Sequence, residues 1–145
     1  MEELFELRTY IEQRDYENAL ALVSEMEEMS RDDKIDKILS FMVIILVHLI
    51  KQQAEKRTTR SWDASIHNSV RGIFHSNKRR KAGGFYLTEN EIKDTIEEAW
   101  ETALERASFE AFEGRYDAKE LLQMINSEQI KAEALQLIMN EQKWE

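Results

Sequence analysis

The sequence contains no cysteine and no proline, and glycine occurs only four times in 145 residues. Without cysteine the chain cannot form disulfides, offer a thiolate nucleophile or bind zinc through sulfur. Proline and glycine form many of the turns between strands in β-rich folds, so their scarcity argues against such a fold. Glu, Leu, Ala, Lys and Gln are abundant instead, and this composition favours helix along nearly the whole chain.

Long hydrophobic runs are also missing. The most apolar stretch, Phe41–Ile50, covers ten residues, whereas a membrane-spanning helix needs about 20. The amino terminus is acidic and amphipathic, and it lacks the basic start and unbroken apolar stretch of a signal peptide. Together with the absence of cysteine, these features predict a cytoplasmic protein with no membrane partner.

What the chain does contain is apolar residues at helical spacing. We predict helices over residues 2–14, 16–29, 30–50, 61–76, 88–114 and 117–144, and a break of the last one near Asn126 is left open. The first two helices carry apolar stripes, formed by Leu4, Leu7, Tyr10 and Ile11 and by Tyr16, Ala19, Leu20, Val23 and Met26.

Polar residues that cap helices mark several of these beginnings. The candidates are Asp15, Ser30, and the capping boxes Thr88–Glu91 and Asp117–Glu120. In a capping box, an oxygen at the cap and a carboxylate three residues later satisfy each other's backbone N–H groups. Gly114 is a candidate stop signal for the preceding helix.

These elements predict an all-α fold, with a single domain over residues 1–145. We expect a bundle of five to seven helices around a central apolar helix, Ile35–Ile50. That helix is apolar nearly all round, which is typical of a helix enclosed by its neighbours. The alternative is that one of its faces forms an oligomer interface.

The charge distribution is the feature that hints at a partner. Residues 51–81 hold nine basic and two acidic residues, or +7, in a chain of net charge −9. The candidate partner-binding or phosphate-binding residues of this basic segment are Lys56, Arg57, Arg60, Trp62, Arg71, Lys78, Arg79, Arg80 and Lys81.

Three interpretations of this basic segment are ranked in order. The first is pairing with acids of the same chain, among which Glu97, Glu98, Glu101 and Glu105 are plentiful. The second is an acidic protein partner or a neighbouring subunit. The third is RNA or DNA, whose binding the acidic flanks would oppose at long range.

Trp62 begins an apolar stripe among cations, so it is predicted to be a core residue. The alternatives are stacking on a nucleic-acid base and receiving the guanidinium of Arg57 or Arg60 over its face.

Catalytic hypotheses are weaker. His48 lies within the apolar run, and the favoured interpretation is a core histidine with one ring nitrogen hydrogen-bonded; a general base or metal ligand is the alternative. Arg60 and His67 have the spacing of an arginine and a histidine that meet one phosphodiester in some metal-independent ribonucleases. Frequent arginines produce such a spacing by chance, and the chain has no Gly-rich phosphate loop and no hydrolase elbow. A non-catalytic protein without a cofactor is therefore favoured, and ribonuclease-like activity is the alternative.

A metal site has one weak candidate. Glu25 and Glu28 lie three residues apart on one helical face, and two carboxylates can hold a divalent cation. A solvated face, or pairing with Arg57 and Arg60, is the favoured interpretation, so we expect no metal site.

Three segments resemble a bacterial family called "domain of unknown function 29". They are the acidic stretch 25–31, the apolar helix ending in His48-Leu49-Ile50-Lys51, and Arg60-Ser61-Trp62 followed by Ser65-Ile66. The family often has a tryptophan after the lysine, where this chain has Gln52, and a proline in the basic linker, which this chain lacks. The apolar helix is therefore expected to extend toward Arg57. The resemblance implies an all-helical fold and no particular activity.

The sequence therefore predicts a non-catalytic interaction protein with a protein partner or a second copy of itself. Nucleic-acid binding or RNA processing through residues 51–81 is the alternative.

Overall fold

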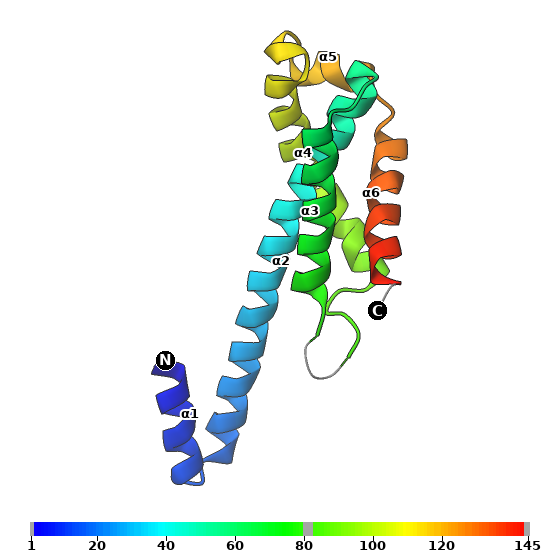
Figure 1. The fold of residues 1–145 in the computed structure, drawn as a ribbon. Helices are drawn as coiled ribbons and strands as arrows, with labels where there is room; N and C mark the ends of the chain where they lie inside the picture. Colours follow the sequence, from blue (N-terminus) through cyan, green and yellow to red (C-terminus); the bar gives the residue numbers. More distant parts are fainter. Residues whose placement is uncertain (1, 80–82, 144–145) are drawn as a thin grey trace. The chain divides into compact units, whose positions relative to one another are not determined.

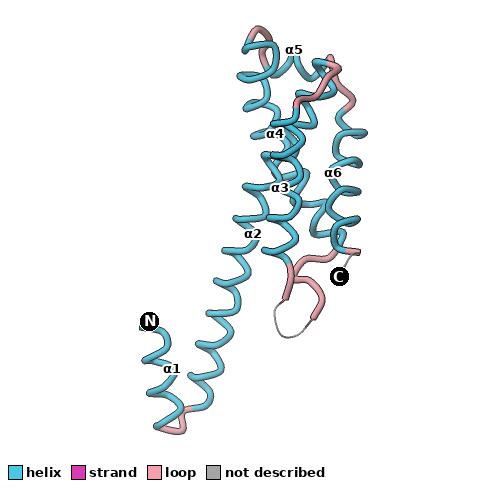
Figure 2. Tube along the Cα trace, in the orientation of Figure 1, coloured by secondary structure: helices cyan, strands magenta, loops and turns pink. Residues whose placement is uncertain are grey.

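The computed structural model describes residues 2–79 and 83–143, and this part of the chain contains six α-helices, one 3₁₀ helix and no strand (Figures 1 and 2). The helices are α1 (Glu2–Glu12), α2 (Tyr16–Glu55), α3 (Arg60–Asn77), α4 (Glu89–Glu110), α5 (Ala118–Gln123) and α6 (Ser127–Gln142); the 3₁₀ helix η1 spans Ala111–Gly114. The all-α prediction is confirmed.

The helices form two compact units, with the boundary between Ile35 and Asp36, inside α2. The first unit contains α1 and the beginning of α2. The second contains the rest of α2 and all later elements. The single domain predicted over residues 1–145 stays a prediction.

The second unit is a helical bundle around the carboxy-terminal half of α2. Its fully buried side chains on this helix are Ile38, Met42, Ile45, Leu46 and Ile50. Phe41 of α2 lies over Gly72 of α3, and Lys51 of α2 donates to Glu110 of α4. In turn, α3 contacts α6, and α4 contacts α5, α6 and η1. The central apolar helix expected from the sequence is therefore enclosed by its neighbours.

A close approach fixes α3 against α2. The ring tip of Phe41 stands over Gly72, and a Cβ added at Gly72 would lie 2.6 Å from the Cζ atom of Phe41. Glycine inside a helix is unfavourable by about 1 kcal/mol relative to alanine. At this position the missing side chain of Gly72 leaves room for the ring of Phe41.

A left-handed turn follows α4. Phe112 and Glu113 have φ/ψ angles of 50°/32° and 58°/31°, and Gly114 has a φ of 80°. Positive φ is uncommon for residues with a side chain. The backbone N–H of Phe112 donates to Glu55 Oε2 of α2 at 3.2 Å, and the rings of Phe112 and Tyr116 meet edge to face with centroids 5.3 Å apart. The helix predicted to stop at Gly114 therefore ends earlier, at Glu110, and Gly114 ends the turn that follows it.

Asn77 holds the connection between α3 and α4. It is fully buried, its side chain donates to Gln142 of α6 at 3.0 Å, and its Oδ1 accepts from the backbone N–H of Leu87 at 2.9 Å. An isolated bridge pairs Lys78 with Phe85. Where the structure describes them, the residues between the predicted helices 61–76 and 88–114 thus form a loop after Asn77.

The first unit is a hairpin of α1 and the beginning of α2. Arg14 has a φ of 61°, and the N–H of Asp15 donates to the carbonyl of Tyr10 at 2.8 Å. Asp15 then caps α2, because its Oδ1 accepts from the N–H of Asn18 at 3.4 Å. The buried apolar side chains here are Ala19 and Leu22.

One predicted boundary is wrong. Ser30 does not begin a helix, because α2 runs unbroken from Tyr16 to Glu55. No proline or glycine interrupts it, and residues 27–33 are exposed, so polar side chains there stay in water without breaking the helix. The helix also continues past Ile50, as the missing linker proline suggested, and it ends where Lys56 adopts a φ of 54°.

Candidate functional site

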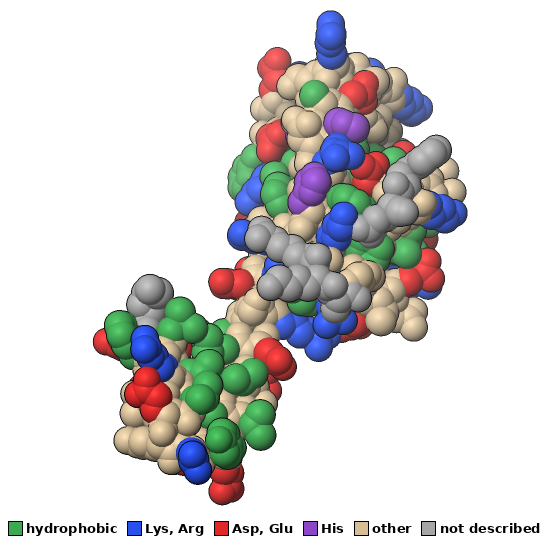
Figure 3. All heavy atoms as spheres, turned by 60° about the horizontal axis from the view of Figure 1, so that its bottom comes forward, with side chains coloured by type: hydrophobic (Ala, Val, Ile, Leu, Met, Phe, Trp, Pro, Cys, Tyr) green, Lys and Arg blue, Asp and Glu red, His purple; other side chains and the backbone are tan. Residues whose placement is uncertain are grey.

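Large apolar side chains are exposed on the amino-terminal hairpin. Figure 3 shows hydrophobic side chains gathered over this unit. We call their set the hairpin surface; it consists of Leu4, Phe5, Ile11, Tyr16, Leu20 and Met29. Phe5 and Leu20 are 69% and 68% exposed. Single exposed apolar residues are ordinary, but a cluster of them marks an interaction site.

The hairpin surface corrects the expected role of the first two apolar stripes. Leu4, Ile11, Tyr16 and Leu20 belong to those stripes, yet each of them is exposed. A hairpin gives each helix one neighbour, so only the side chains on the mutual face can be covered. The remainder of each stripe faces outward.

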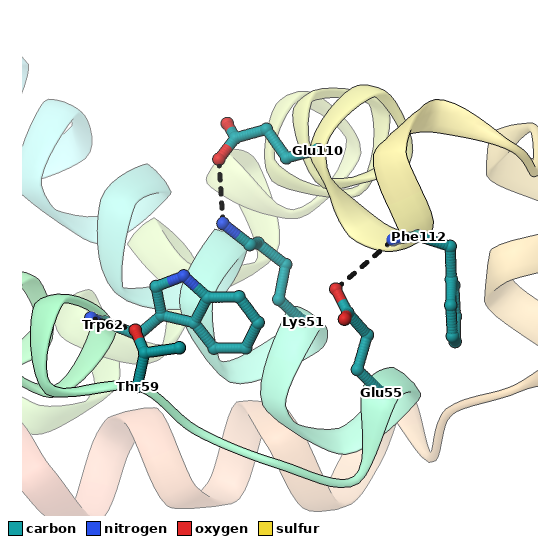
Figure 4. A network of polar contacts seen from close by, with 6 residues as sticks. All are labelled: Lys51, Glu55, Thr59, Trp62, Glu110 and Phe112. Atoms are coloured by element: carbon teal, nitrogen blue, oxygen red, sulfur yellow. Dashed lines mark hydrogen bonds and ion pairs between the residues drawn. The ribbon is translucent and has the colours of Figure 1, made fainter.

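The second unit holds a polar cluster around Lys51. Its side chain is only 8% exposed, and its Nζ lies 3.0 Å from Glu110 Oε1 and 4.5 Å from the ring centroid of Trp62. Figure 4 shows Lys51 pointing toward Glu110 beside the indole. A buried ammonium is costly unless it is paired, so the carboxylate and the ring together make this burial tolerable.

Glu55 extends this cluster in two directions. One carboxylate oxygen accepts from the N–H of Phe112, and the other lies 3.0 Å from Nε of Arg57. The guanidinium of Arg57 covers the Trp62 ring, with Cζ 4.7 Å from the centroid. Trp62 is half-buried, so it both packs in the bundle and receives Arg57, one of the alternatives raised by the sequence.

His48 lies next to this cluster. Its ring is half-buried and lies 6.3 Å from that of Trp62. Nδ1 is buried without a hydrogen-bond partner among the described residues, in place of the hydrogen bond expected for a core histidine. Burial lowers the pKa of His48, and the nearby Lys51 ammonium lowers this pKa further, against an opposing effect of Glu110. The neutral imidazole is therefore favoured.

The basic segment is partly paired within the fold. Besides Arg57 with Glu55, Arg71 Nη1 lies 2.5 Å from Glu141 Oε1 of α6. The acids that pair are thus Glu55, Glu110 and Glu141 rather than the predicted set, of which only Glu97 has an ion pair among the described residues, with Lys131.

Other cations of the segment have different surroundings. Lys78 lies 5.8 Å from the Phe74 ring and Arg79 lies 5.7 Å from the Tyr86 ring. Lys56 and Arg60 are exposed and have no ion pair with the described residues. Arg80 and Lys81 lie outside the described residues.

Arg60 and His67 are not brought together. Both lie on α3, seven positions apart, which corresponds to a rise of about 10 Å. His67 is exposed and lines a cleft between α2, α3 and α6 with Asp63 and Glu133. Arg71 instead approaches His75 at 3.4 Å.

Glu25 and Glu28 are exposed on the part of α2 that belongs to the first unit. No group of three or more side chains suited to hold a metal ion occurs in residues 2–79 and 83–143.

Sequence reasoning missed the roles of Lys51, Glu55 and Glu110. Lys51 was counted only as one charge of a basic segment. A signal was present in the family likeness itself, because His48, Lys51 and Trp62 lie in two of its three segments and approach one another in space. For the hairpin surface, the signal was Phe5, which lies off the apolar stripe of its own helix.

The fold and these surfaces define an all-helical protein with an apolar hairpin surface and a polar cluster inside its bundle. The chain matches the family "Domain of unknown function DUF29" over residues 8–125, and it belongs to that family. No curated protein and no solved structure matches it. Among the described helices, none combines the length and apolar character required to cross a membrane.

Proposed function

We propose that the chain is a non-catalytic interaction protein of the cytoplasm that binds another protein through the hairpin surface. The observation that carries this proposal is the exposure of six large apolar side chains on a two-helix unit in which Ala19 and Leu22 are the only buried ones of the described residues. Water-exposed apolar area of this kind is stabilised when a partner covers it.

The energetic scale supports binding. Fully burying an apolar side chain contributes about 1.5–3 kcal/mol, so four of the six would contribute about 6–12 kcal/mol. Association costs about 4–15 kcal/mol in lost freedom. Burial of this surface is therefore enough to offset most of that cost, and further contacts would set the final affinity.

The test is photo-crosslinking of the full chain in the cells that make it. A photoreactive benzoylphenylalanine replaces Phe5 in one variant and Leu20 in another. A third variant carries it at Phe109 of α4, which is 72% exposed and serves as the matched control. We expect the same discrete adduct from the two hairpin positions and a different pattern from the control.

The outcome that contradicts the proposal is equally direct. If neither hairpin position gives an adduct, or if all three positions give the same one, the hairpin surface is not the binding site. As a specificity check, Leu20→Ser should remove the adduct formed from Phe5, and circular dichroism should confirm that its helix content is unchanged.

Nucleic-acid binding is the second candidate. It is favoured by the exposure of Lys56 and Arg60 without ion pairs among the described residues, and by the four lysines and arginines that the sequence holds at positions 78–81. Labelled RNA should then be retarded, less so at higher salt, and Lys56→Glu with Arg60→Glu should abolish retardation. Lys37→Glu, another exposed position on α2, is the control. Equal retardation by all variants would exclude this site.

A further inference from the structure

The hairpin surface lies in an acidic part of the chain. Residues 1–35 contain eleven acidic and four basic residues, so their formal charge is −7. Exposed acids of the same two helices, which we call the acidic rim, include Glu2, Glu6, Glu12, Glu17 and Glu27.

The basic residues of this unit do not balance its acids. Arg8 is paired with Glu12 at 3.0 Å, and Arg31 and Lys34 have interactions of their own. Because four cations cannot neutralise eleven carboxylates, the surface offers apolar contact inside a negative rim.

We propose, building on the docking role above, that the hairpin surface binds a basic amphipathic helix of a partner protein. Apolar side chains of that helix would contact the hairpin surface, and its lysines or arginines would meet the acidic rim. Helix-in-groove binding of this kind combines apolar anchors with charge complementarity that guides encounter and excludes wrong partners.

A helix suits the geometry of the surface. Tyr16 and Leu20 lie one turn apart on α2, and Leu4 and Ile11 lie two turns apart on α1, so each pair faces one side of its helix. A third helix laid along the hairpin gives each helix a second neighbour. The added helix covers those exposed apolar side chains that face the side of the hairpin on which it lies.

Charge also decides against a second copy of the hairpin as the occupant. Two identical hairpins would bring −7 against −7, and like charges brought together oppose association. A basic helix removes that repulsion and neutralises the rim.

The test measures binding of a defined probe to the full chain by fluorescence anisotropy. The probe is a labelled helical peptide of about 20 residues, long enough to form a helix, with leucine on one face and lysine on the other. Its partner probe has glutamate in place of every lysine. We expect the lysine peptide to bind at least about tenfold more tightly, with an affinity that falls as salt rises.

Variants locate the site. Phe5→Ser with Leu20→Ser should weaken the lysine peptide by about tenfold or more, whereas Phe109→Ser should leave its affinity unchanged. Both substituted hairpin positions are exposed, and circular dichroism checks that the helices remain. Equal binding of both peptides, no binding of the lysine peptide, or unchanged binding by the hairpin variant would each overturn the inference.

The two proposals fail in different ways. A crosslinked adduct of twice 17.2 kDa, formed by the chain with itself, would retain the docking role and overturn the basic partner. Absence of any adduct from Phe5 and Leu20 would remove the docking role itself.

Discussion

At the scale of single residues, α2 buries two polar side chains in or next to its apolar run, those of Lys51 and His48. Lys51 is buried, but its ammonium meets Glu110 and the face of Trp62. His48, one turn earlier, has a buried Nδ1 with no partner among the described residues. The burial of Lys51 is therefore compensated by its contacts, whereas the burial of His48 Nδ1 destabilises the folded state.

The uncompensated His48 predicts a pH dependence of stability. Its pKa is lowered in the folded state, so the unfolded chain binds the proton more readily. The contribution of neutral His48 is present above the ordinary imidazole pKa of about 6.5 and is lost as pH falls through that value toward the lowered pKa. Because the ring is only half-buried, the loss should stay below about 1 kcal/mol.

His48→Leu should remove this component. Urea unfolding at pH 7.5 and pH 5.5 is the measurement, and the variant should lose less stability between the two values than the parent. His67→Gln, at an exposed position of α3, should behave like the parent. If His48→Leu keeps the full pH dependence, His48 is not its source.

At the scale of helices, the sequence predicted where helices begin better than it predicted whether a helix continues through a polar segment. Asp15, Thr88 and Asp117 supply the predicted cap acceptors at helix starts, because a cap is a local hydrogen bond. Asn126, predicted only as a possible break, is the cap of α6. Ser30 also has a side-chain oxygen that could cap a helix, but no helix begins there. A cap residue favours a start only where the preceding backbone leaves the helix, and nothing at residues 27–33 makes it leave.

Close packing between helices could not be predicted from the sequence. Gly72 looked like an ordinary helical glycine, and only the structure shows Phe41 against it. Which ring lies over which glycine depends on the rotation of two helices about their axes. The apolar spacing of a helix shows roughly which side of the helix is buried. It does not determine the rotation of the helix closely enough to predict which two side chains touch.

Gly72→Ala should therefore destabilise the protein despite the higher helix propensity of alanine. The new methyl group meets the Phe41 ring, and overpacking of this kind costs about 1–3 kcal/mol. Urea unfolding should show the loss, and Phe41→Leu should restore part of it in the double variant. A Gly72→Ala protein more stable than the parent would mean that the ring moves aside freely.

At the scale of the whole molecule, the buried core belongs almost entirely to one unit. All buried apolar side chains of the described residues except Ala19 and Leu22 lie after residue 35. The sequence predicted the enclosure of the apolar run well, because nine apolar residues among ten consecutive positions leave few alternatives in water. It could not distinguish an apolar stripe that is buried from one that stays exposed, since both have the same spacing.

A chain of residues 36–145 should accordingly fold by itself. We expect a cooperative thermal transition within about 5 °C of the parent, followed by circular dichroism. Deleting residues 127–145 is the control, because it removes Ile130, Ala134 and Ile138 from the core and should abolish cooperativity. If residues 36–145 fail to fold, the single domain over 1–145 is the better description.

The left-handed turn after α4 has a consequence for the order of folding events. Phe112 and Glu113 each occupy backbone conformations that cost about 1 kcal/mol or more, and the carboxylate that holds Phe112 comes from 57 positions earlier. Such a turn cannot nucleate by itself, since its support arrives only once α2 and α4 have docked. It is therefore among the last parts of the bundle to form and among the first to open, so weakening it should speed unfolding and leave the refolding rate almost unchanged.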